Sequence, residues 1–393
     1  MRRRRSAVGR WRRFYVAAAI CIGTSASGET WHVALDGGGD YAVIQDAVDA
    51  AAAGDTINIG HGRYDDFEIV HAPGWAEPTI VLINKDDLTL IGSGVGETRI
   101  GPETFFGGPG VVPKSICCIE SYSCTIQRLT VENCRDGIYW GAGRLELQEC
   151  EILDYEMGLG TFAEGGLLVN ETNFRSIRGT SYAITAYPPS RDLLVVDCQF
   201  SGSGRGAYFT GSLNVHITDC WFSCAGGNIR YTNSIGLVER CTVAEGAAQG
   251  VIVASNSEVQ ITDSVINGHT IALQVHSGSI VNSSGCVFSG GTNDATIDIY
   301  STSQVNLHGC DILNGGNYSV KVEYFFNQFI EQDMAGNYWG TTDTAQIDAW
   351  IWDGHDDAAI HSVVNYLPIA DGPVPVESHT WTEVKGLFRE AGR

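Results

Sequence analysis

The sequence is poor in proline, methionine and positive charge, and each shortage narrows what the protein can be. Only 10 of its 393 residues are proline, and only 3 are methionine. Aspartate and glutamate number 46 against 24 lysines and arginines, which gives a formal net charge of −22. A surface this acidic repels nucleic-acid phosphates and anionic lipids, so we expect no nucleic-acid partner and no membrane-surface role.

Long apolar runs are also missing, because no segment after residue 28 is apolar enough to span a membrane. Residues 1–28 contain the three parts of an export signal: a basic stretch, an apolar stretch over 14–23, and small residues at 24–28. We predict that 1–28 is a signal peptide and that the protein is secreted, periplasmic or held at the cell surface. We expect a monomer without a membrane anchor.

Several motifs that would assign an activity are absent. The sequence has no glycine motif for nucleotides, no Ser-His-Asp signature, and no paired Cys-x-x-Cys or histidine set for zinc. Twelve cysteines are present, however, and one of them, Cys21, lies in the predicted leader. This leaves eleven cysteines whose role the repeat pattern must explain.

What the sequence has in quantity is glycine, with 48 residues, and a segment that recurs about every 23 residues. Each copy alternates apolar and polar residues, reaches a small Cys, Thr or Ser, and has Phe, Ile or Val two positions later. We call the small residue the anchor. The anchors are separated by 22, 26, 22, 21, 23, 22 and 24 residues, at Cys150, Thr172, Cys198, Cys220, Cys241, Ser264, Cys286 and Cys310.

A second alternating segment follows in each repeat, for example over 250–253 and 296–300. Two or three short strands per coil predict an all-β fold, a single parallel β-helix with coils of about 22–23 residues. A β-propeller would need roughly 40–45 residues per repeat. In a solenoid, equivalent residues stack about 4.8 Å apart, so a shared position must tolerate its own copy above and below.

The anchor position is therefore expected to form one buried column of small side chains. Thr172 and Ser264 occupy it as well as cysteine, so we predict a mostly reduced ladder there and no disulfide framework. The cysteines away from the column are the better disulfide candidates, namely Cys117, Cys118, Cys124 and Cys224.

Near the start of the repeat region, Ile44, Ala47, Val48 and Ala51 share one helical face. Near its end, the run Gly-Asn-Tyr-Trp-Gly over 336–340 opens a terminal segment. With these two ends, the sequence resembles the pectin-lyase-like superfamily of right-handed β-helices, and exported bacterial repeat proteins of unassigned function in particular. The resemblance implies a helix over about 41–53 that caps the solenoid, a right-handed β-helix over 29–370 and a C-terminal cap over about 336–370. Residues 371–393 are then a tail.

The superfamily includes pectate lyases, polygalacturonases, pectin methylesterases, alginate epimerases and binding proteins without activity. None of their catalytic motifs is present as a set. One surface remains of interest, because the second strand of each coil alternates inward and outward residues. We place Arg230, Ile252, Gln274, Asp298 and Lys321 in its outward row.

From this row we predict catalytic residues, and from the row together with aromatic residues elsewhere in the repeat region we predict substrate-binding residues and possible stacking platforms for sugar rings. Asp298 and Lys321 are equally consistent with a cross-strand ion pair. Trp140 and Tyr231 are expected to point inward. The catalytic candidates are Arg230, Asp298 and Lys321, and the substrate-binding candidates are Tyr139, Tyr208 and Gln274. The possible platforms are Tyr139, Tyr182, Tyr187, Tyr208, Phe209 and Trp221.

No cofactor is assigned by the sequence, and Ca²⁺ is the one cation that the acidic residues suggest. Asp353, Asp356 and Asp357 form the densest acidic cluster and are the candidate metal ligands. A glycine-rich segment between Asp36 and Asp40 also suggests a cation site, but it lacks the full spacing of a Ca²⁺ loop, and we favour a simple turn before the cap helix.

Three functions follow as hypotheses. The first is an exported β-helix that binds extracellular polysaccharide or a cell-surface glycan, or serves as a surface scaffold. The second is a polysaccharide lyase or glycoside hydrolase, acting on a uronic-acid-containing glycan with a non-standard site. The third is a periplasmic metal-handling accessory protein, which three methionines and scattered histidines do not favour.

Overall fold

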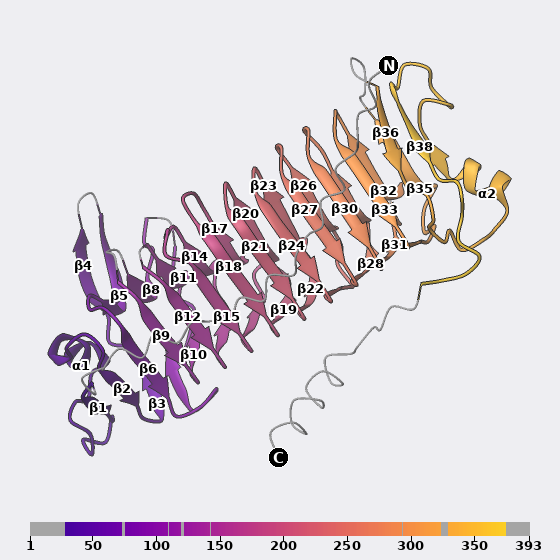
Figure 1. Ribbon diagram of the computed structural model, residues 1–393. Helices are drawn as coiled ribbons and strands as arrows, with labels where there is room; N and C mark the ends of the chain where they lie inside the picture. The colour runs from indigo at the N-terminus through magenta and orange to yellow at the C-terminus, as the bar shows by residue number, and fades with distance from the viewer. Residues whose placement is uncertain are drawn as a thin grey trace.

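The computed structural model describes residues 28–72, 75–108, 110–118, 122–141, 143–292, 294–323 and 329–374. The chain winds into an elongated parallel β-solenoid of about 12 turns, with α1 (Ile44–Ala50) near one end and α2 (Thr344–Ala349) near the other (Figure 1). The predicted all-β β-helix with an N-terminal cap helix is confirmed. The predicted signal peptide, apart from Gly28, and the tail beyond residue 374 lie outside the described residues.

Three long sheets run along the solenoid axis, because each coil contributes one strand to each sheet. We call them sheets A, B and C. Sheet A has 14 strands and contains the segments that precede the anchors. Its members are β1 (Thr30–Val33), β2 (Thr56–Ile59), β6 (Leu88–Gly92), β9 (Cys124–Gln127), β12 (Leu145–Gln148), β15 (Leu167–Asn170), β18 (Arg191–Val196), β21 (Leu213–Thr218), β24 (Ile235–Glu239), β27 (Glu258–Thr262), β30 (Ile280–Ser284), β33 (Gln304–His308), β36 (Ile330–Asp333) and β38 (Ser362–Asn365).

Sheet B has 11 strands, and most of them begin directly after an anchor. Its strands are the shortest of the three sheets, which fits a narrow side of the coil. Its members are β3 (Gly62–Tyr64), β7 (Thr98–Ile100), β10 (Thr130–Glu132), β13 (Glu151–Leu153), β16 (Asn173–Ser176), β19 (Gln199–Gly202), β22 (Trp221–Cys224), β25 (Thr242–Val243), β28 (Val265–His269), β31 (Val287–Gly290) and β34 (Asp311–Ile312).

Sheet C has 13 strands and contains the second alternating segment of each coil. All its strand pairs are parallel except the hairpin of β4 and β5 at its N-terminal edge. Its members are β4 (Glu68–Ala72), β5 (Trp75–Ile83), β8 (Lys114–Cys118), β11 (Asp136–Trp140), β14 (Met157–Thr161), β17 (Tyr182–Ala186), β20 (Arg205–Thr210), β23 (Ile229–Thr232), β26 (Gln249–Ala254), β29 (Ile271–Val275), β32 (Ala295–Tyr300), β35 (Tyr318–Glu323) and β37 (Ile351–Trp352).

Stacked aromatic rings fill the core beside sheet B. Phe174, Phe200 and Phe222 each lie two residues after an anchor and are fully buried. Their ring centroids are 5.1 and 4.3 Å apart, and neighbouring rings are within 6° of parallel. Equivalent residues thus lie one above another, as the repeat predicts, and a ring fits there because its copy one coil away stacks on its face.

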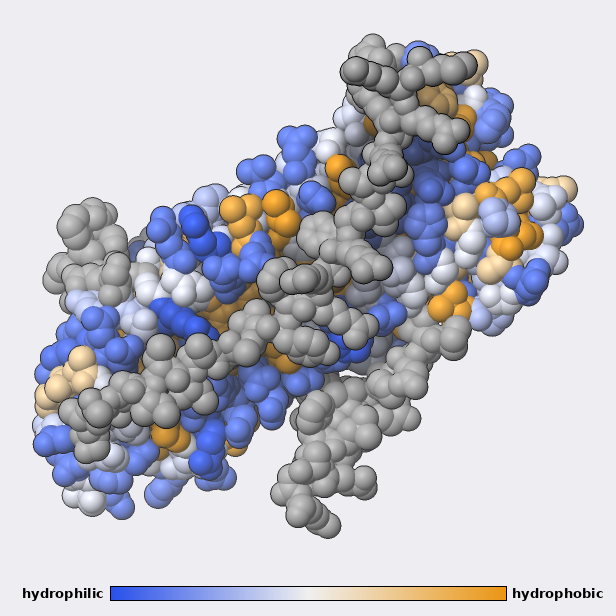
Figure 2. Space-filling model, viewed as in Figure 1, coloured by the Kyte–Doolittle hydropathy of each residue, from blue (hydrophilic) through white to orange (hydrophobic). Residues whose placement is uncertain are grey.

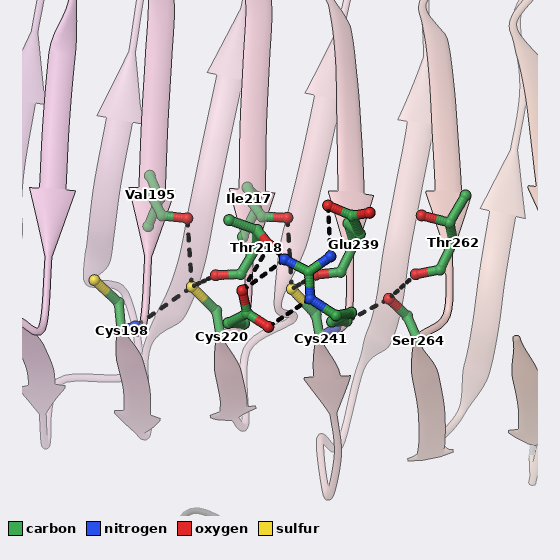
Figure 3. A network of polar contacts seen from close by, with 11 residues as sticks. Val195, Cys198, Ile217, Thr218, Cys220, Glu239, Cys241, Thr262 and Ser264 are labelled. Carbon is green, nitrogen blue, oxygen red and sulfur yellow. Dashed lines mark hydrogen bonds and ion pairs between the residues drawn. The ribbon is translucent and has the colours of Figure 1, made fainter. Parts of the chain in front are cut away.

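The anchors form a hydrogen-bonded ladder as well as a small-residue column. Cys198, Cys220 and Ser264 each donate to the carbonyl two residues earlier, over 3.0, 3.2 and 2.7 Å, and Figure 3 shows the bonds of Cys220 and Ser264. The backbone N–H of Cys198 donates to Cys220 Sγ at 3.4 Å, and that of Cys241 to Ser264 Oγ at 3.0 Å. The position therefore selects a short side chain that both donates and accepts, which Cys, Ser and Thr all provide.

The chain makes a sharp turn immediately before the anchor. The residue just before it adopts a left-handed backbone, with φ of 51° at Asp197, 56° at Asp219 and 49° at Asp263. Short acidic and amide side chains tolerate this region better than most residues, and glycine takes the position at Gly285 and Gly309. The turn redirects the chain from sheet A into sheet B.

The described cysteines are buried and form no disulfide. The predicted reduced ladder is therefore present, but the disulfide prediction for Cys117, Cys118, Cys124 and Cys224 is wrong in this structure. Cys117 and Cys118 are neighbours on β8 and so point to opposite faces, while Cys124 and Cys224 belong to different sheets. Burial raises the pKa of Cys117 and of Cys224 to about 12, which leaves little thiolate to react.

A second ladder, made of serines, lies where the chain passes from sheet C into sheet A. The backbone N–H of Ser212 donates to Ser234 Oγ at 3.0 Å, and that of Ser234 donates to Ser257 Oγ at the same distance. The ladder continues from Ser257 N to Ser279 Oγ at 3.2 Å, and Ser303 occupies the equivalent position one coil later. The spacing of 22 to 24 residues between these serines is visible in the sequence.

Amide side chains close the ends of the solenoid. On α1, Gln45 Oε1 accepts from the backbone N–H of Leu82 at 2.7 Å, and its Nε2 donates to the carbonyl of the same residue. At the other end, Gln332 Oε1 accepts from Val305 N at 2.8 Å, and its Nε2 donates to Ser303 O and Ser362 Oγ. These amides satisfy backbone groups that the next coil would otherwise have paired.

Candidate functional site

The six predicted catalytic and substrate-binding residues lie on one outward row of sheet C. Strand register places each of them directly beside its neighbour on the next coil. The same row continues to the last strand of the sheet, β37. In order, it reads Tyr139, Gly160, Thr185, Tyr208, Arg230, Ile252, Gln274, Asp298, Lys321 and Trp352. The predicted register is therefore correct, and what these residues do remains a prediction.

Side-chain direction divides the predicted stacking platforms into two groups. Trp140 and Tyr231 are fully buried in the core, as expected. Phe209 is also fully buried, so its assignment as a platform is wrong: it pairs in register with the inward Tyr231. Trp221 lies on β22 of sheet B and is separated from the others. Tyr187 is outward and 38% exposed.

An aromatic cluster occupies the N-terminal half of this face. The rings of Phe162 and Tyr187 stack with centroids 4.9 Å apart at 9°, and the ring of Tyr139 lies 5.3 Å from that of Phe162. Beside them, Tyr182 meets Tyr208 edge-on at 5.0 Å. We did not predict Phe162, yet it follows β14 just as Tyr187 follows β17, one coil later.

Arg205 and Arg230 provide positive charge beside these rings. The Arg205 guanidinium lies 4.8 Å from the centroid of the Tyr182 ring, a cation–π contact. Arg230 follows Tyr208 in the outward row, and its Nε donates to Thr232 Oγ1 at 3.2 Å. Arg230 is half-buried and forms no salt bridge with another of the described residues.

The C-terminal end of sheet C is hollowed into an open pocket of about 430 Å³. Lys321 lines it and pairs with Asp294 at 2.5 Å and with Glu323. The rings of Tyr318 and Trp352 form an aromatic wall, with centroids 5.8 Å apart at 52°. The lining comprises Asp294, Asn317, Tyr318, Lys321, Glu323, Trp352, Asp357 and Ile360.

Asp298 lies beside Lys321 in the row but does not form the predicted ion pair with it. Its Oδ2 accepts a hydrogen bond from Tyr300 Oη at 2.6 Å, while Lys321 pairs with Asp294 and Glu323 instead. Asp298 is only 5% exposed, and its Oδ1 has no hydrogen-bond partner within the described structure. Burial raises the pKa of Asp298 to about 6.

The ion pairs of Lys321 set the charge of the pocket. The hydrogen bond from Lys321 lowers the pKa of Asp294 below its ordinary value. Burial opposes the charge on Lys321, but hydrogen bonds to Asp294 and Glu323 outweigh it and raise its pKa. Lys321 and Asp294 are therefore both ionised near neutral pH.

The opposite end of sheet C holds a buried ionic cluster that we did not predict. Lys114 Nζ lies 2.7 Å from Glu77 and 3.5 Å from Asp136, and 5.1 Å from the centroid of the Tyr139 ring. Burial raises the pKa of Asp136 to about 6, although Lys114 acts in the opposite direction. The sequence signal was weak, because Glu77 reaches the cluster from the β4–β5 hairpin.

The predicted metal ligands do not converge on one point. Asp353 is 2% exposed, and its carboxylate accepts from the backbone N–H groups of His355 and Val364, each at 2.7 Å. Asp356 and Asp357 accept from Asp353 N and Ala359 N. Across the described part of the chain, no three His, Cys, Asp or Glu side chains are grouped as a metal would require. Asp353 folds the C-terminal turn in this structure.

The segment between Asp36 and Asp40 forms a turn, as the favoured interpretation of the sequence predicts. Asp36 Oδ1 accepts from Gly38 N, and Asp40 Oδ2 accepts from His32 N, both at 2.9 Å. These bonds fold the segment back on itself before the cap helix.

A family model described as a right handed beta helix region matches residues 114–234. Among curated proteins, none matches the chain significantly. Within the described residues, no helix is both long enough and apolar enough to cross a membrane.

Three solved structures illustrate the likeness of fold. Pectin methylesterase from carrot is 13% identical with a TM-score of 0.41, over 76% of this chain and 89% of that one. The A-module of the Azotobacter vinelandii mannuronan C-5 epimerase AlgE4 is 12% identical with a TM-score of 0.41, over 86% and 93%. A tailspike protein of E. coli bacteriophage HK620, in complex with a hexasaccharide, is 13% identical with a TM-score of 0.42, over 80% and 59%.

Proposed function

We propose that this right-handed parallel β-helix, the fold of the pectin-lyase-like superfamily, binds a glycan chain along the outer face of sheet C. The observation that carries the proposal is the single outward row that joins the aromatic cluster to the C-terminal pocket. Consecutive row positions are about 4.8 Å apart, so the members of the row that are not buried present contacts at multiples of this spacing to an extended polymer. We place this activity outside the cytoplasm and assign it to a monomer.

The chemistry of the row suits a sugar chain. Aromatic faces offer apolar area for the C–H faces of sugar rings, and Tyr187 stacks on Phe162 with its own ring 38% exposed. Arg230 and Gln274 add side-chain donors for sugar hydroxyls between the aromatic cluster and the pocket. The face of the molecule seen in Figure 2 is mostly hydrophilic, with separate hydrophobic patches.

Hydrolysis of the bound glycan is a second candidate, and Asp298 is the observation that favours it. Its raised pKa of about 6 keeps a proton available in mildly acidic solution, as a general acid requires. Asp294 and Glu323 contact the same Lys321 ammonium, so carboxylates are close together at this end. A lyase instead needs cations around a uronate carboxylate, and here Lys321 is already paired.

A glycan array with the purified chain tests the proposal, followed by titration calorimetry on each glycan that binds. We expect Tyr187→Ala to weaken binding about tenfold, because it removes one stacking surface. Trp221→Ala is the matched control: it deletes an aromatic ring from sheet B and is expected to leave the affinity unchanged. An unsaturated-uronate absorbance assay and a reducing-end assay on the same glycans separate lyase, hydrolase and simple binding.

If no neutral, amino-sugar or uronic-acid glycan bound in the presence of Ca²⁺, the proposal would be overturned. If Tyr187→Ala and Trp221→Ala weakened binding equally, the assignment of the binding surface to sheet C would be contradicted.

A further inference from the structure

The last described residues run back along the outside of the solenoid toward its N-terminal end. After β38, the carbonyl of Pro368 accepts from Gly336 N at 2.5 Å, at the turn between sheets A and B. Val374 N then donates to Asp311 Oδ1 at 2.7 Å, one coil nearer to the N-terminus. Asp311 begins β34, so the chain reaches residue 375 beside the outer face of sheet B.

The outer face of sheet B is apolar near Asp311 and polar farther away. The first residues of its strands β13 to β34 lie in one outward row. Away from Asp311 this row continues as Val287, Val265, Thr242 and Trp221, and then as Gln199, Asn173 and Glu151. Val265 is 9% exposed, whereas Val287 and Trp221 are half-buried. Because water disfavours apolar side chains in an outward row, a further layer over this stretch would be stabilising.

The sequence after residue 374 has the pattern of an amphipathic helix with a start signal. Thr380 and Glu383 have the spacing of an N-terminal capping box. A helix that begins there would place apolar side chains on one face, namely Trp381, Val384, Leu387 and Phe388. Cations would flank that face at intervals of four residues, namely Lys385, Arg389 and Arg393. Such a helix needs a surface that covers its apolar side.

The C-terminal segment, residues 375–393, is long enough to reach the apolar stretch and to cover it. Residues 375–380 need to bridge only the single coil from Asp311 to Val287, about 4.8 Å, and can extend to roughly 20 Å. A helix over 381–391 would be about 16 Å long, and the strands from Val287 to Trp221 span about 14 Å. The helix and the apolar stretch therefore match in length along the solenoid axis.

The charges of the turn beside sheet B favour the same placement. An acidic column lies at this turn, two residues before the outward row, and comprises Glu149, Glu171, Asp197, Asp219 and Asp263. Among the described residues, only Asp219 of this column has a salt bridge, to Arg240. Burial, together with the carboxylates of Asp219 and Glu171, raises the pKa of Asp197 to about 6. Cations beside the column would relieve this repulsion, and the flank of the helix provides them.

From these observations we propose that residues 380–391 form a helix that packs along the outer face of sheet B. Its apolar face covers Val287, Val265 and Trp221, and its cations lie next to the acidic column. The partner of this surface is therefore the protein's own C-terminal segment. The inference does not depend on glycan binding, which we assign to sheet C.

Hydrogen–deuterium exchange of the full chain, read by mass spectrometry, tests the inference. We expect the backbone amides of residues 381–391 to exchange at least about tenfold more slowly than those of a synthetic peptide of residues 376–393. Trp221→Ala and Val287→Asp should each remove most of this protection, because they delete or charge the covered surface. Leu213→Asp is the matched control, since it places a carboxylate at an apolar, 47% exposed position of sheet A.

Charge reversal in the C-terminal segment tests the contact with the acidic column. Lys385→Glu combined with Arg389→Glu should speed the exchange of residues 381–391 about fivefold at low salt, and the difference should shrink as salt screens the charges. Thermal melting shows whether each variant keeps its fold. The two sheet B variants are independent, so the test stays decisive if one of them does not fold.

Three results would overturn the inference. The first is exchange of residues 381–391 at the rate of the free peptide in the unsubstituted protein. The second is protection that rises with protein concentration, which would assign the surface to a second copy of the chain. The third is protection that survives in both sheet B variants, or that Leu213→Asp removes equally, which would place the segment elsewhere. None of these results bears on the glycan titrations, which test sheet C.

Discussion

The side chain of Asn337 completes the hydrogen-bond ladder at Cys310. Asn337 Oδ1 accepts from the backbone N–H of Cys310 at 2.7 Å, the bond that an anchor of a further coil would otherwise supply. Its Nδ2 donates to Leu307 O at 2.7 Å and to Met334 O at 2.8 Å. One fully buried amide therefore replaces the next coil of the solenoid.

Replacing this amide should destabilise the C-terminal end. Asn337→Ala removes three hydrogen bonds and leaves buried backbone groups unpaired, so we expect a loss of about 3 kcal/mol in the free energy of unfolding. Urea denaturation followed by circular dichroism measures it. Asn306→Ala is the control, since among the described residues its side chain bonds to the side chains of Asn282 and Gln304, on the half-exposed face of sheet A. Equal losses in the two variants would contradict a capping role for Asn337.

The anchor position should select between side chains by their hydrogen bonding and not by their size alone. Cys220 Sγ donates to Thr218 O and accepts from Cys198 N, as a serine hydroxyl does at Ser264 (Figure 3). We expect Cys220→Ser to change the free energy of unfolding by less than about 1 kcal/mol, and Cys220→Val to cost about 2 kcal/mol or more. Chemical denaturation under reducing conditions compares them. If valine were tolerated as well as serine, the column would be a packing feature only.

The sequence predicts the coil better than it predicts the site, for a physical reason. A residue stacked on its own copy must repeat, so Cys150, Phe174 and Phe222 reveal the period, and alternation along the strand predicts which residues of sheet C face outward. The row from Arg230 to Lys321 follows directly from that alternation.

Contacts that depend on loops and on burial did not follow from the repeat. Phe162 lies just beyond its strand, and Glu77 reaches Lys114 from a hairpin outside the repeat. The pairing of Lys321 with Asp294, not Asp298, depends on where the chain before β32 turns. Outward direction also failed to predict exposure, since Asp298 faces outward and is nonetheless buried.

The ionic cluster at the N-terminal end of sheet C should be sensitive to loss of its cation. Lys114→Met leaves the carboxylates of Glu77 and Asp136 near each other without the ammonium that pairs with both. We therefore expect the free energy of unfolding to fall by about 3 kcal/mol at pH 7. The double variant Lys114→Met with Asp136→Asn should recover part of this loss, because it removes one of the two uncompensated charges. Denaturation midpoints at constant m-value provide the measurement, and no recovery in the double variant would contradict electrostatic coupling.

Two carboxyl groups of the C-terminal region should respond to pH with opposite sign. Burial raises the folded-state pKa of Asp298 to about 6, above the unfolded value of about 3.9. Its contribution to stability is therefore fully present below about pH 4 and is lost as pH rises through 6, a change of roughly 3 kcal/mol. Asp298→Asn should consequently become more stable relative to the unsubstituted protein as pH increases from 4 to 7.

Asp294 provides the contrast, because the hydrogen bond from Lys321 lowers its folded-state pKa. The stability that ionised Asp294 contributes is present above its unfolded-state pKa and is lost as the pH falls through its folded-state pKa. Asp294→Asn should therefore lower the free energy of unfolding more at pH 7 than at pH 3. Urea unfolding of both variants across this range gives the two slopes. Slopes of the same sign would mean that Asp298 is not held in its protonated form by burial, and that the general-acid role considered for it lacks its physical basis.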